Sequence, residues 1–130
     1  MADVRWIVAD FSAALAQLRE ALAEPARLDL IKAGCIQYFE FSFELGWKAC
    51  KLVSSEQGLP DCHSPKACLR QAFSQGWIED EAIWLEMLDA RNRMAHTYDA
   101  RKALEIYESL PRFHDALRKL LSALQSHTTE

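Results

Sequence analysis

Residues 31 to 53 read IKAGCIQYFEFSFELGWKACKLV and form the most apolar part of the sequence. When this segment is wound as an α-helix from Asp29 to about Gln57, its polar side chains fall on one narrow line. The line consists of Gln37, Glu40, Glu44, Lys48, Lys51 and Ser55. A helix with so little polar surface needs neighbours on nearly every side, so two arrangements stay open. It is either the central helix of a monomeric bundle or a helix partly covered by a second copy of the chain.

The segments around it also show helical periodicity. From Val4 to Leu22 the apolar residues are three or four positions apart, which is typical of one core helix. Ser64 followed by Pro65 predicts the start of a short helix, because serine caps a helix and proline suits its first position. Glycine favours the end of a helix, so this short helix stops near Gly76. The apolar side chains that it offers to the core are Leu69, Ala72 and Phe73.

Two further helices are predicted in the C-terminal half. One begins around Asp80, where acidic side chains favour the helix dipole, and ends near Asp99. The other follows with a long apolar stripe, and Pro111 lies on its opposite, polar face, which indicates a kink rather than a break. We therefore predict an all-α fold for a single domain of residues 1–130. It is an up-and-down four-helix bundle with one additional short helix.

The composition of the chain fits a folded domain. Half of the 130 residues are hydrophobic, and only 4 are glycine and 4 proline, which argues against disorder. The formal net charge of -4 is a poor match for a protein that coats nucleic acid. Residues 91–119, however, carry 7 basic and 4 acidic side chains, a local charge of +3. We therefore expect any anion-binding site at or after Arg91.

The cysteines and the hydropathy pattern indicate the cellular compartment in which the protein is expected. The chain has four cysteines: Cys35, Cys50, Cys62 and Cys68. Because the N-terminal residues show helical periodicity rather than a secretory signal, we expect reduced thiols in a cytoplasmic protein. Cys62, His63 and Cys68 resemble metal ligands, but the second half of a zinc site is missing, so we expect neither a metal nor a cofactor. No membrane span is expected, because the uncharged run in the most apolar segment extends only over residues 33–39.

An arginine interrupts the apolar face of the helix that is predicted to begin near residue 80. In the motif RNRMAHTYD, residues 91–99, Arg91 lies on the same stripe as Met87. An ionised group there must meet an acidic partner, a second protein surface or an anionic ligand. Arg91 and His96 lie about 140° apart around the helix, whereas Asn92 and His96 share a face. The site would therefore lie between two stripes and be completed by another helix or a second copy of the chain.

The residue types of this motif suit cleavage of a phosphodiester without a metal. An ordinary histidine side chain titrates near neutral pH, so His96 could take up or give a proton. Arg91 can hold a phosphate and offset the charge of its transition state. In RNA the 2′-hydroxyl can attack, so no external nucleophile is required. A plainer explanation stays open: Arg91 and His96 merely favour the helix dipole, and Asp89 pairs with Arg93 in an ordinary salt bridge.

The motif and three other stretches carry a family resemblance. RNRMAHTYD matches the pattern of HEPN domains, in which an arginine and an asparagine are followed by three residues and a histidine. Tyr98 follows two residues later, as in members that accompany minimal nucleotidyltransferases. The chain resembles one branch in particular, the nucleotidyltransferase substrate-binding proteins. The stretches that match this branch are FEFSFELGWKACK (39–51), SPKACLRQAFSQGWI (64–78) and WLEMLDARN (84–92).

The resemblance implies a two-fold homodimer in which both copies of Arg91, Asn92 and His96 line one groove as catalytic residues. Many members are ribonuclease toxins restrained by a cognate minimal nucleotidyltransferase antitoxin, which implies an RNA substrate and a toxin-antitoxin pair. Some of these partners transfer adenylyl groups to the motif tyrosine, so Tyr98 is the candidate modification site. The chain departs from the commoner relatives by having Arg93 and Met94 inside the motif, and Arg93 either supports anion binding or only pairs with Asp89.

Three functions are therefore compatible with the sequence. The leading hypothesis is an enzyme, a metal-independent endoribonuclease controlled by its nucleotidyltransferase. The alternative is a non-catalytic substrate-binding subunit of a two-component nucleotidyltransferase, which the branch name and the acidic overall charge favour. The third is a structural bundle without a site, and it requires an Arg91 side chain that points into water.

Overall fold

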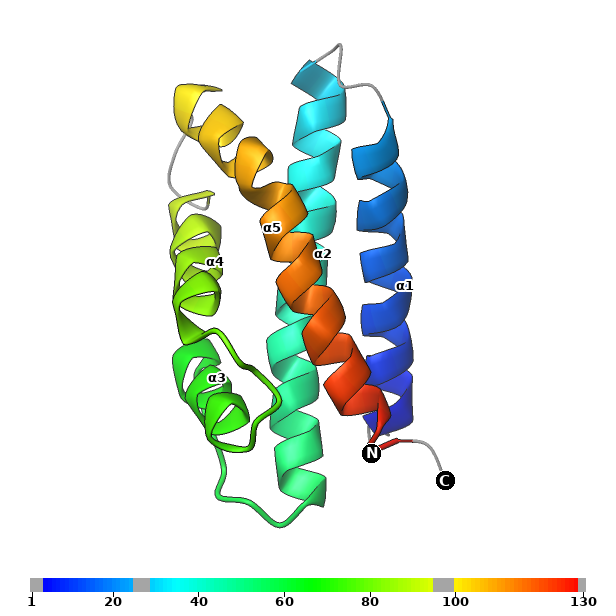
Figure 1. Ribbon diagram of the computed structural model, residues 1–130, viewed down its shortest axis with the longest axis vertical. Coiled ribbons are helices and arrows are strands. Elements are labelled where there is room, and N and C mark those ends of the chain that lie inside the picture. The colour runs from blue at the N-terminus through cyan, green and yellow to red at the C-terminus, as the bar shows by residue number, and fades with distance from the viewer. Residues whose placement is uncertain (1–3, 25–28, 95–99, 129–130) are drawn as a thin grey trace.

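Five helices make up the structure, a computed structural model that describes residues 4–24, 29–94 and 100–128. They are α1 (Val4–Ala23), α2 (Asp29–Glu56), α3 (Pro65–Ser74), α4 (Glu81–Met94) and α5 (Ala100–Gln125). α1 and α2 lie side by side in opposite directions, α5 crosses them, and α3 and α4 follow one another along the remaining side (Figure 1). The predicted all-α bundle with one short additional helix is confirmed, and the described residues contain no strand.

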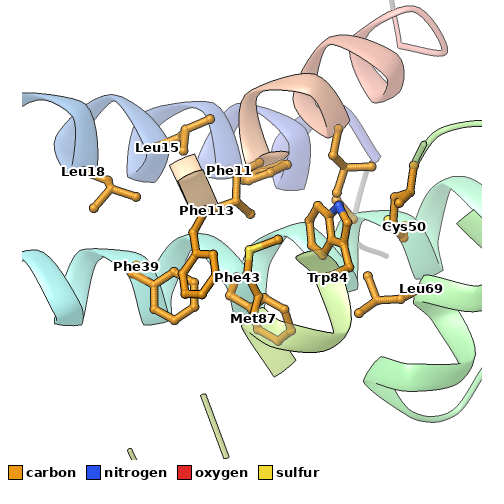
Figure 2. Packing of buried hydrophobic residues seen from close by; sticks show 14 of the residues in the cluster. Phe11, Leu15, Leu18, Phe39, Phe43, Cys50, Leu69, Trp84, Met87 and Phe113 are labelled. Carbon is orange, nitrogen blue, oxygen red and sulfur yellow. The ribbon is translucent and has the colours of Figure 1, made fainter. Parts of the chain in front are cut away.

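The hydrophobic core surrounds α2. This helix packs against α1, α3 and α5, and aromatic side chains fill much of the space between the helices (Figure 2). Phe39 of α2 stacks on Phe113 of α5 with ring centroids 5.2 Å apart. Phe43, one turn further along α2, lies 6.1 Å from the ring of Trp84 on α4. The two phenylalanines of α2 thus connect the long helices to the side of the bundle that carries the motif.

α2 shows the polar line that its sequence predicts. The residues of this line are exposed at Gln37, Lys48, Lys51 and Ser55 and half-buried at Glu40 and Glu44. Two apolar side chains outside the line are also exposed, Leu30 with 79% and Phe41 with 47% of its surface. The described residues of one chain therefore leave part of the apolar surface of α2 uncovered.

The two ends of α3 follow the predicted capping rules. Ser64 Oγ accepts a hydrogen bond from the Ala67 backbone N–H at 3.1 Å, and Pro65 is the first helical residue. Beyond the helix, Gly76 has a φ of 79°, a conformation that favours glycine. The prediction that Phe73 packs into the core is wrong, since 42% of its surface is exposed. Phe73 lies about 90° from the centre of the buried stripe of α3. That stripe consists of Cys68, Leu69 and Ala72.

A disulfide joins Cys62, in the loop before α3, to Cys68 within the helix. The expectation of reduced thiols is wrong for this pair, because the turn into α3 brings their Cα atoms to 5.2 Å, within the usual range for a disulfide. Cys35 and Cys50 are free and buried. Burial raises the pKa of the Cys50 thiol to about 12, so its thiolate is scarce at neutral pH. In the part of the chain that the structure describes, no group of three or more His, Cys, Asp or Glu side chains is placed to hold a metal ion.

α4 and α5 agree with their predicted limits where they are described. The Asp80 carboxylate accepts a hydrogen bond from the Ala82 backbone N–H at 3.1 Å and so caps the start of α4. α5 continues through Pro111, which is exposed on the face away from the core. Its buried stripe consists of Ile106, Leu110, Phe113, Leu117, Leu120 and Leu124. None of the helices described is both long and apolar enough to cross a membrane.

Candidate functional site

α4 carries the motif arginine to the side of α2. Trp84, Met87 and Ala90 are buried on the face of α4 that packs into the bundle. Arg91 follows Ala90 directly and lies one turn beyond Met87, so its stem begins at the edge of this buried face. The guanidinium then extends toward α2, where it meets a carboxylate.

Two side chains hold the Arg91 guanidinium. Its Nη2 lies 2.6 Å from Glu44 Oε1 on α2, and its Nη1 donates a hydrogen bond to the Asn92 side-chain oxygen at 3.1 Å. The side chains of Arg91 and Glu44 keep 34% and 30% of their surface exposed, so water screens the pair only in part. Of the three partners that the sequence allows for Arg91, the structure supplies the acidic one, from the same chain.

Glu44 is held from its other side as well. Trp47 Nε1 donates a hydrogen bond to Glu44 Oε2 at 3.1 Å, and Lys48 Nζ lies 3.9 Å from the same oxygen. Glu44 Oε1 is buried and forms no hydrogen bond with the described residues, so its contact with Arg91 is an ion pair. The hydrogen bond from Trp47 to Oε2 fixes the direction of the carboxylate, which in turn orients the guanidinium. Sequence reasoning placed Glu44 on the polar line of α2 but missed this role. Glu40 lies one turn away on the same line, and the sequence contains no signal that chooses between the two.

Glu40 is a second carboxyl group near Arg91. Desolvation by burial raises its pKa, the positive charge of Arg91 acts in the opposite direction, and the negative charge of Glu44 raises the pKa further. Arg91 therefore influences carboxyl groups on two successive turns of α2, although its short contact is with Glu44.

The remaining motif residues occupy different positions. Asn92 is exposed, and its side chain accepts the hydrogen bond from Arg91. Arg93 forms a salt bridge of 2.8 Å with Asp89, and both side chains are more than half exposed. The ordinary pairing of Arg93 with Asp89 that the sequence allows is therefore present. Two predicted site residues lie outside the described residues: His96 and Tyr98.

A groove of about 630 Å³ opens between α2, the end of α4 and the start of α5. We call it the α2/α5 groove. Most of the surface that lines the groove is apolar and includes Ile36, Met94 and Leu104. Polar side chains in the lining include Lys32, Gln37 and Glu40. Two lining residues connect the groove to the motif. Burial raises the pKa of Glu40 and the positive charge of Arg91 opposes this rise, and Met94 lies three residues after Arg91 on α4. The site therefore combines a held cation with an adjoining apolar space.

Comparison with known proteins identifies relatives of the chain. A family model described as nucleotidyltransferase substrate binding protein like matches residues 8–126. A curated relative from Haemophilus influenzae, described as a probable ribonuclease HepT, is 35% identical over an alignment of 89 residues, and the match covers 65% of this chain. The match spans only 61% of that relative's own length.

Two solved structures resemble the whole bundle. A protein from Thermus thermophilus superposes with a TM-score of 0.81 at 31% identity, covering 88% of this chain and 98% of its own. HI0074 from Haemophilus influenzae superposes with a TM-score of 0.80 at 28% identity, covering 91% of this chain and 98% of its own. The HI0074 structure is described as revealing the fold of a substrate binding domain of a nucleotidyltransferase.

Proposed function

The chain belongs to the nucleotidyltransferase substrate binding protein like family, and from this premise we propose that it is a HEPN-type endoribonuclease controlled by a partner nucleotidyltransferase. Its described helices form the HEPN-like bundle of its solved relatives. The relative described as a probable ribonuclease HepT supports the cleavage activity. The description of HI0074 supports the nucleotidyltransferase partner. In this proposal the two proteins act as a toxin and its antitoxin.

The observation that carries the proposal is the Arg91 guanidinium, held at the boundary between α2 and α4. A guanidinium has five N–H donors, and the contacts to Glu44 and Asn92 leave other donors for a phosphate. Since about a third of the Arg91 side chain is exposed, an anion can reach it from solvent. The orientation that Glu44 imposes means that little rearrangement is needed when the phosphate binds.

In the proposed reaction, His96 removes the proton of the RNA 2′-hydroxyl or passes a proton to the leaving 5′-oxygen. The bond from the 2′-oxygen to phosphorus forms while the bond from phosphorus to the 5′-oxygen breaks. The products are a 2′,3′-cyclic phosphate and a 5′-hydroxyl. Arg91 binds the phosphate and offsets the negative charge that builds on its oxygens, and Asn92 supports the guanidinium.

A homodimer fits the surface that one chain leaves uncovered. Leu30 and Phe41 of α2 are exposed apolar side chains, and a second copy covering them would bury this area. We propose that the second copy also brings its own Arg91 and His96 next to those of the first, since these residues diverge on a single straight helix. Light scattering checks the oligomeric state, and Phe41→Glu is expected to convert the dimer to monomers. A monomeric wild-type protein would contradict this part of the proposal.

Control by the partner is proposed to act at Tyr98. The oxygen of its hydroxyl would bond to the α-phosphorus of ATP as pyrophosphate leaves and the hydroxyl proton is released. The product is a phosphodiester, with its negative charge, in the motif that contains Arg91. Co-expression with the proposed partner nucleotidyltransferase should add the mass of one adenylyl group, and Tyr98→Phe should abolish the addition. An unchanged mass in the presence of ATP and an active transferase would remove this mode of control.

The cleavage proposal is tested with the purified protein, RNA and a chelator. We expect cyclic phosphate ends, and we expect Arg91→Ala and His96→Ala to lose at least about a hundredfold in rate, the scale of general acid-base and charge stabilisation. Arg118→Ala is the matched control, because it removes an exposed arginine on α5 that pairs with Asp115. Cleavage that survives unchanged in His96→Ala rules out the assignment.

A second function is favoured by the pairing of Arg91 within its own chain. If Glu44 holds the guanidinium permanently, the protein is a non-catalytic subunit that presents substrate to the nucleotidyltransferase. This function predicts no RNA cleavage and stable co-purification with the transferase. A protein that binds no nucleotidyltransferase would count against it.

A further inference from the structure

The α2/α5 groove is lined in part by α2 and α4, the two helices that carry Glu44 and Arg91. Its lining includes Glu40, which lies one turn before Glu44 on α2, and Met94, which lies three residues after Arg91 on α4. The groove lies between α2 and the first turns of α5, and its lining also includes Ile36, which is almost fully buried. Its volume of about 630 Å³ lies within the range of small-ligand pockets.

The lining of the α2/α5 groove combines apolar, hydrogen-bonding and positively charged side chains. Ile36, Met94 and Leu104 offer apolar contacts that suit the face of a flat ring. Gln37 and Glu40 are the hydrogen-bonding side chains of the α2 wall, and Glu40 is half-buried. Lys32 and Arg101 also line the groove and make it attractive to anions. An apolar floor with a carboxylate on one wall and cations in the lining matches a nucleotide better than it matches a purely apolar segment.

We infer that the α2/α5 groove is the subsite for a guanine base of the RNA next to the bond that is cleaved, with Glu40 as the residue that selects it. This inference rests on the proposed ribonuclease function. Sequence-specific proteins read single-stranded RNA by splaying bases into pockets and bonding their edges. A carboxylate offers only acceptors, and guanine alone among the four bases presents two adjacent donors, N1–H and the N2 amino group. Adenine, cytosine and uracil each place an acceptor beside their donor and would leave the carboxylate poorly paired.

Binding is tested first with guanosine 5′-monophosphate, a probe that the proposed activity cannot cleave. Selective ¹³C labelling of the methionine methyl groups gives a reporter in the groove, Met94, and an internal control, Met87, which is fully buried in the core. We expect a saturable shift of the Met94 signal and none of the Met87 signal. Adenosine 5′-monophosphate should bind about tenfold more weakly, the scale of one bidentate base contact.

Three variants test separately the selection of guanine by Glu40, the binding of nucleotide in the groove, and the effect of removing a carboxylate outside it. Glu40→Gln should remove the preference for guanosine 5′-monophosphate while leaving the bundle folded. Leu104→Glu, at an exposed position of the groove, should abolish the Met94 shift for both nucleotides. Glu108→Gln, an exposed carboxylate of α5 outside the groove, is the matched control and should behave as wild type.

Cleavage gives an independent readout. On an oligonucleotide with one guanosine moved along the sequence, the cut is expected to move with it, and Glu40→Gln should spread cleavage over other positions. If RNA is cut but the cut ignores guanosine, the inference fails and the ribonuclease function stands. If no RNA is cut but Met94 responds to guanosine 5′-monophosphate, the ribonuclease function fails and the nucleotide site remains. A Met94 signal that moves with protein dilution and not with nucleotide identifies the groove as a contact between copies and overturns the inference.

Discussion

The salt bridge between Arg91 and Glu44 should couple α4 to α2 more strongly than a surface pair does. At an effective dielectric constant of about 20, two charges 4 Å apart attract by about 4 kcal/mol, and loss of hydration offsets much of this. Because each side chain keeps about a third of its surface exposed, we discount the remainder for screening by water. We expect a coupling free energy of about 1.5 kcal/mol.

A double-mutant cycle measures this coupling. Arg91→Met removes the charge but keeps an apolar stem on the buried stripe of α4. Glu44→Gln removes the opposite charge but keeps an oxygen that can accept the hydrogen bond from Trp47. The free energy of unfolding in urea is measured for the wild type, both single variants and the double variant. Each single variant leaves one charge without its partner, so the double variant should lose less than the sum of the two.

The pair formed by Asp89 and Arg93 provides a matched control on the same helix. Its side chains are 59% and 53% exposed, and it joins two residues four apart on α4, so it connects no other element. The expected coupling from Asp89→Asn and Arg93→Met is about 0.4 kcal/mol. If the coupling between Arg91 and Glu44 is no larger than this control, Glu44 does not hold the guanidinium and the reasoning is refuted.

Three further perturbations test other parts of the molecule. Replacing both Cys62 and Cys68 by serine removes a disulfide between residues 6 positions apart, so the free energy of unfolding should fall by roughly 2 kcal/mol. The measurement is urea denaturation of the variant and of the oxidised wild type, and equal stability would mean that the bond does not form. Burial raises the pKa of Glu40, so the native state binds the proton of this carboxyl group more tightly than the unfolded state does. The free energy of unfolding in urea should therefore fall as the pH rises through the window just above 4.5. Glu40→Gln should flatten this part of the pH dependence. Phe113→Ala removes the ring that stacks on Phe39 and should cost about 3–5 kcal/mol by urea denaturation, whereas a loss below about 1 kcal/mol would contradict the core described here.

The fold was largely predictable because each helix carries its own local signals. The apolar stripes of α1 and α5 fix their faces, and Ser64 with Pro65 fixes the start of α3. Phe73 shows the limit of this reasoning, because a residue at the edge of a stripe is buried only if a neighbouring helix reaches it. Helical periodicity describes one helix at a time and contains no information on the distance to the next.

The site was predictable only in part for the same reason. The charge of Arg91 on an apolar stripe revealed that it needs a partner, but choosing Glu44 over Glu40 requires the angle between α2 and α4. The bond between Cys62 and Cys68 likewise depends on the path of the loop into α3. The expectation of free thiols rested on the compartment, which does not determine whether two Cα atoms come within reach.

The intrachain pairing of Arg91 also bears on how the site would distinguish substrate from transition state. A partly buried ion pair adds little net stability, and an apolar residue at this position would serve the fold as well. Glu44 neutralises part of the positive charge, so the guanidinium should bind a singly charged phosphodiester weakly. As the 2′-oxygen attacks, negative charge builds on the phosphate oxygens, and donors that are already oriented gain more from this charge than from the ground state. Glu44→Gln should therefore lower KM, by strengthening ground-state binding of RNA, and should lower kcat, by freeing the guanidinium to rotate. A variant in which both constants are unchanged would show that the carboxylate has no part in positioning Arg91.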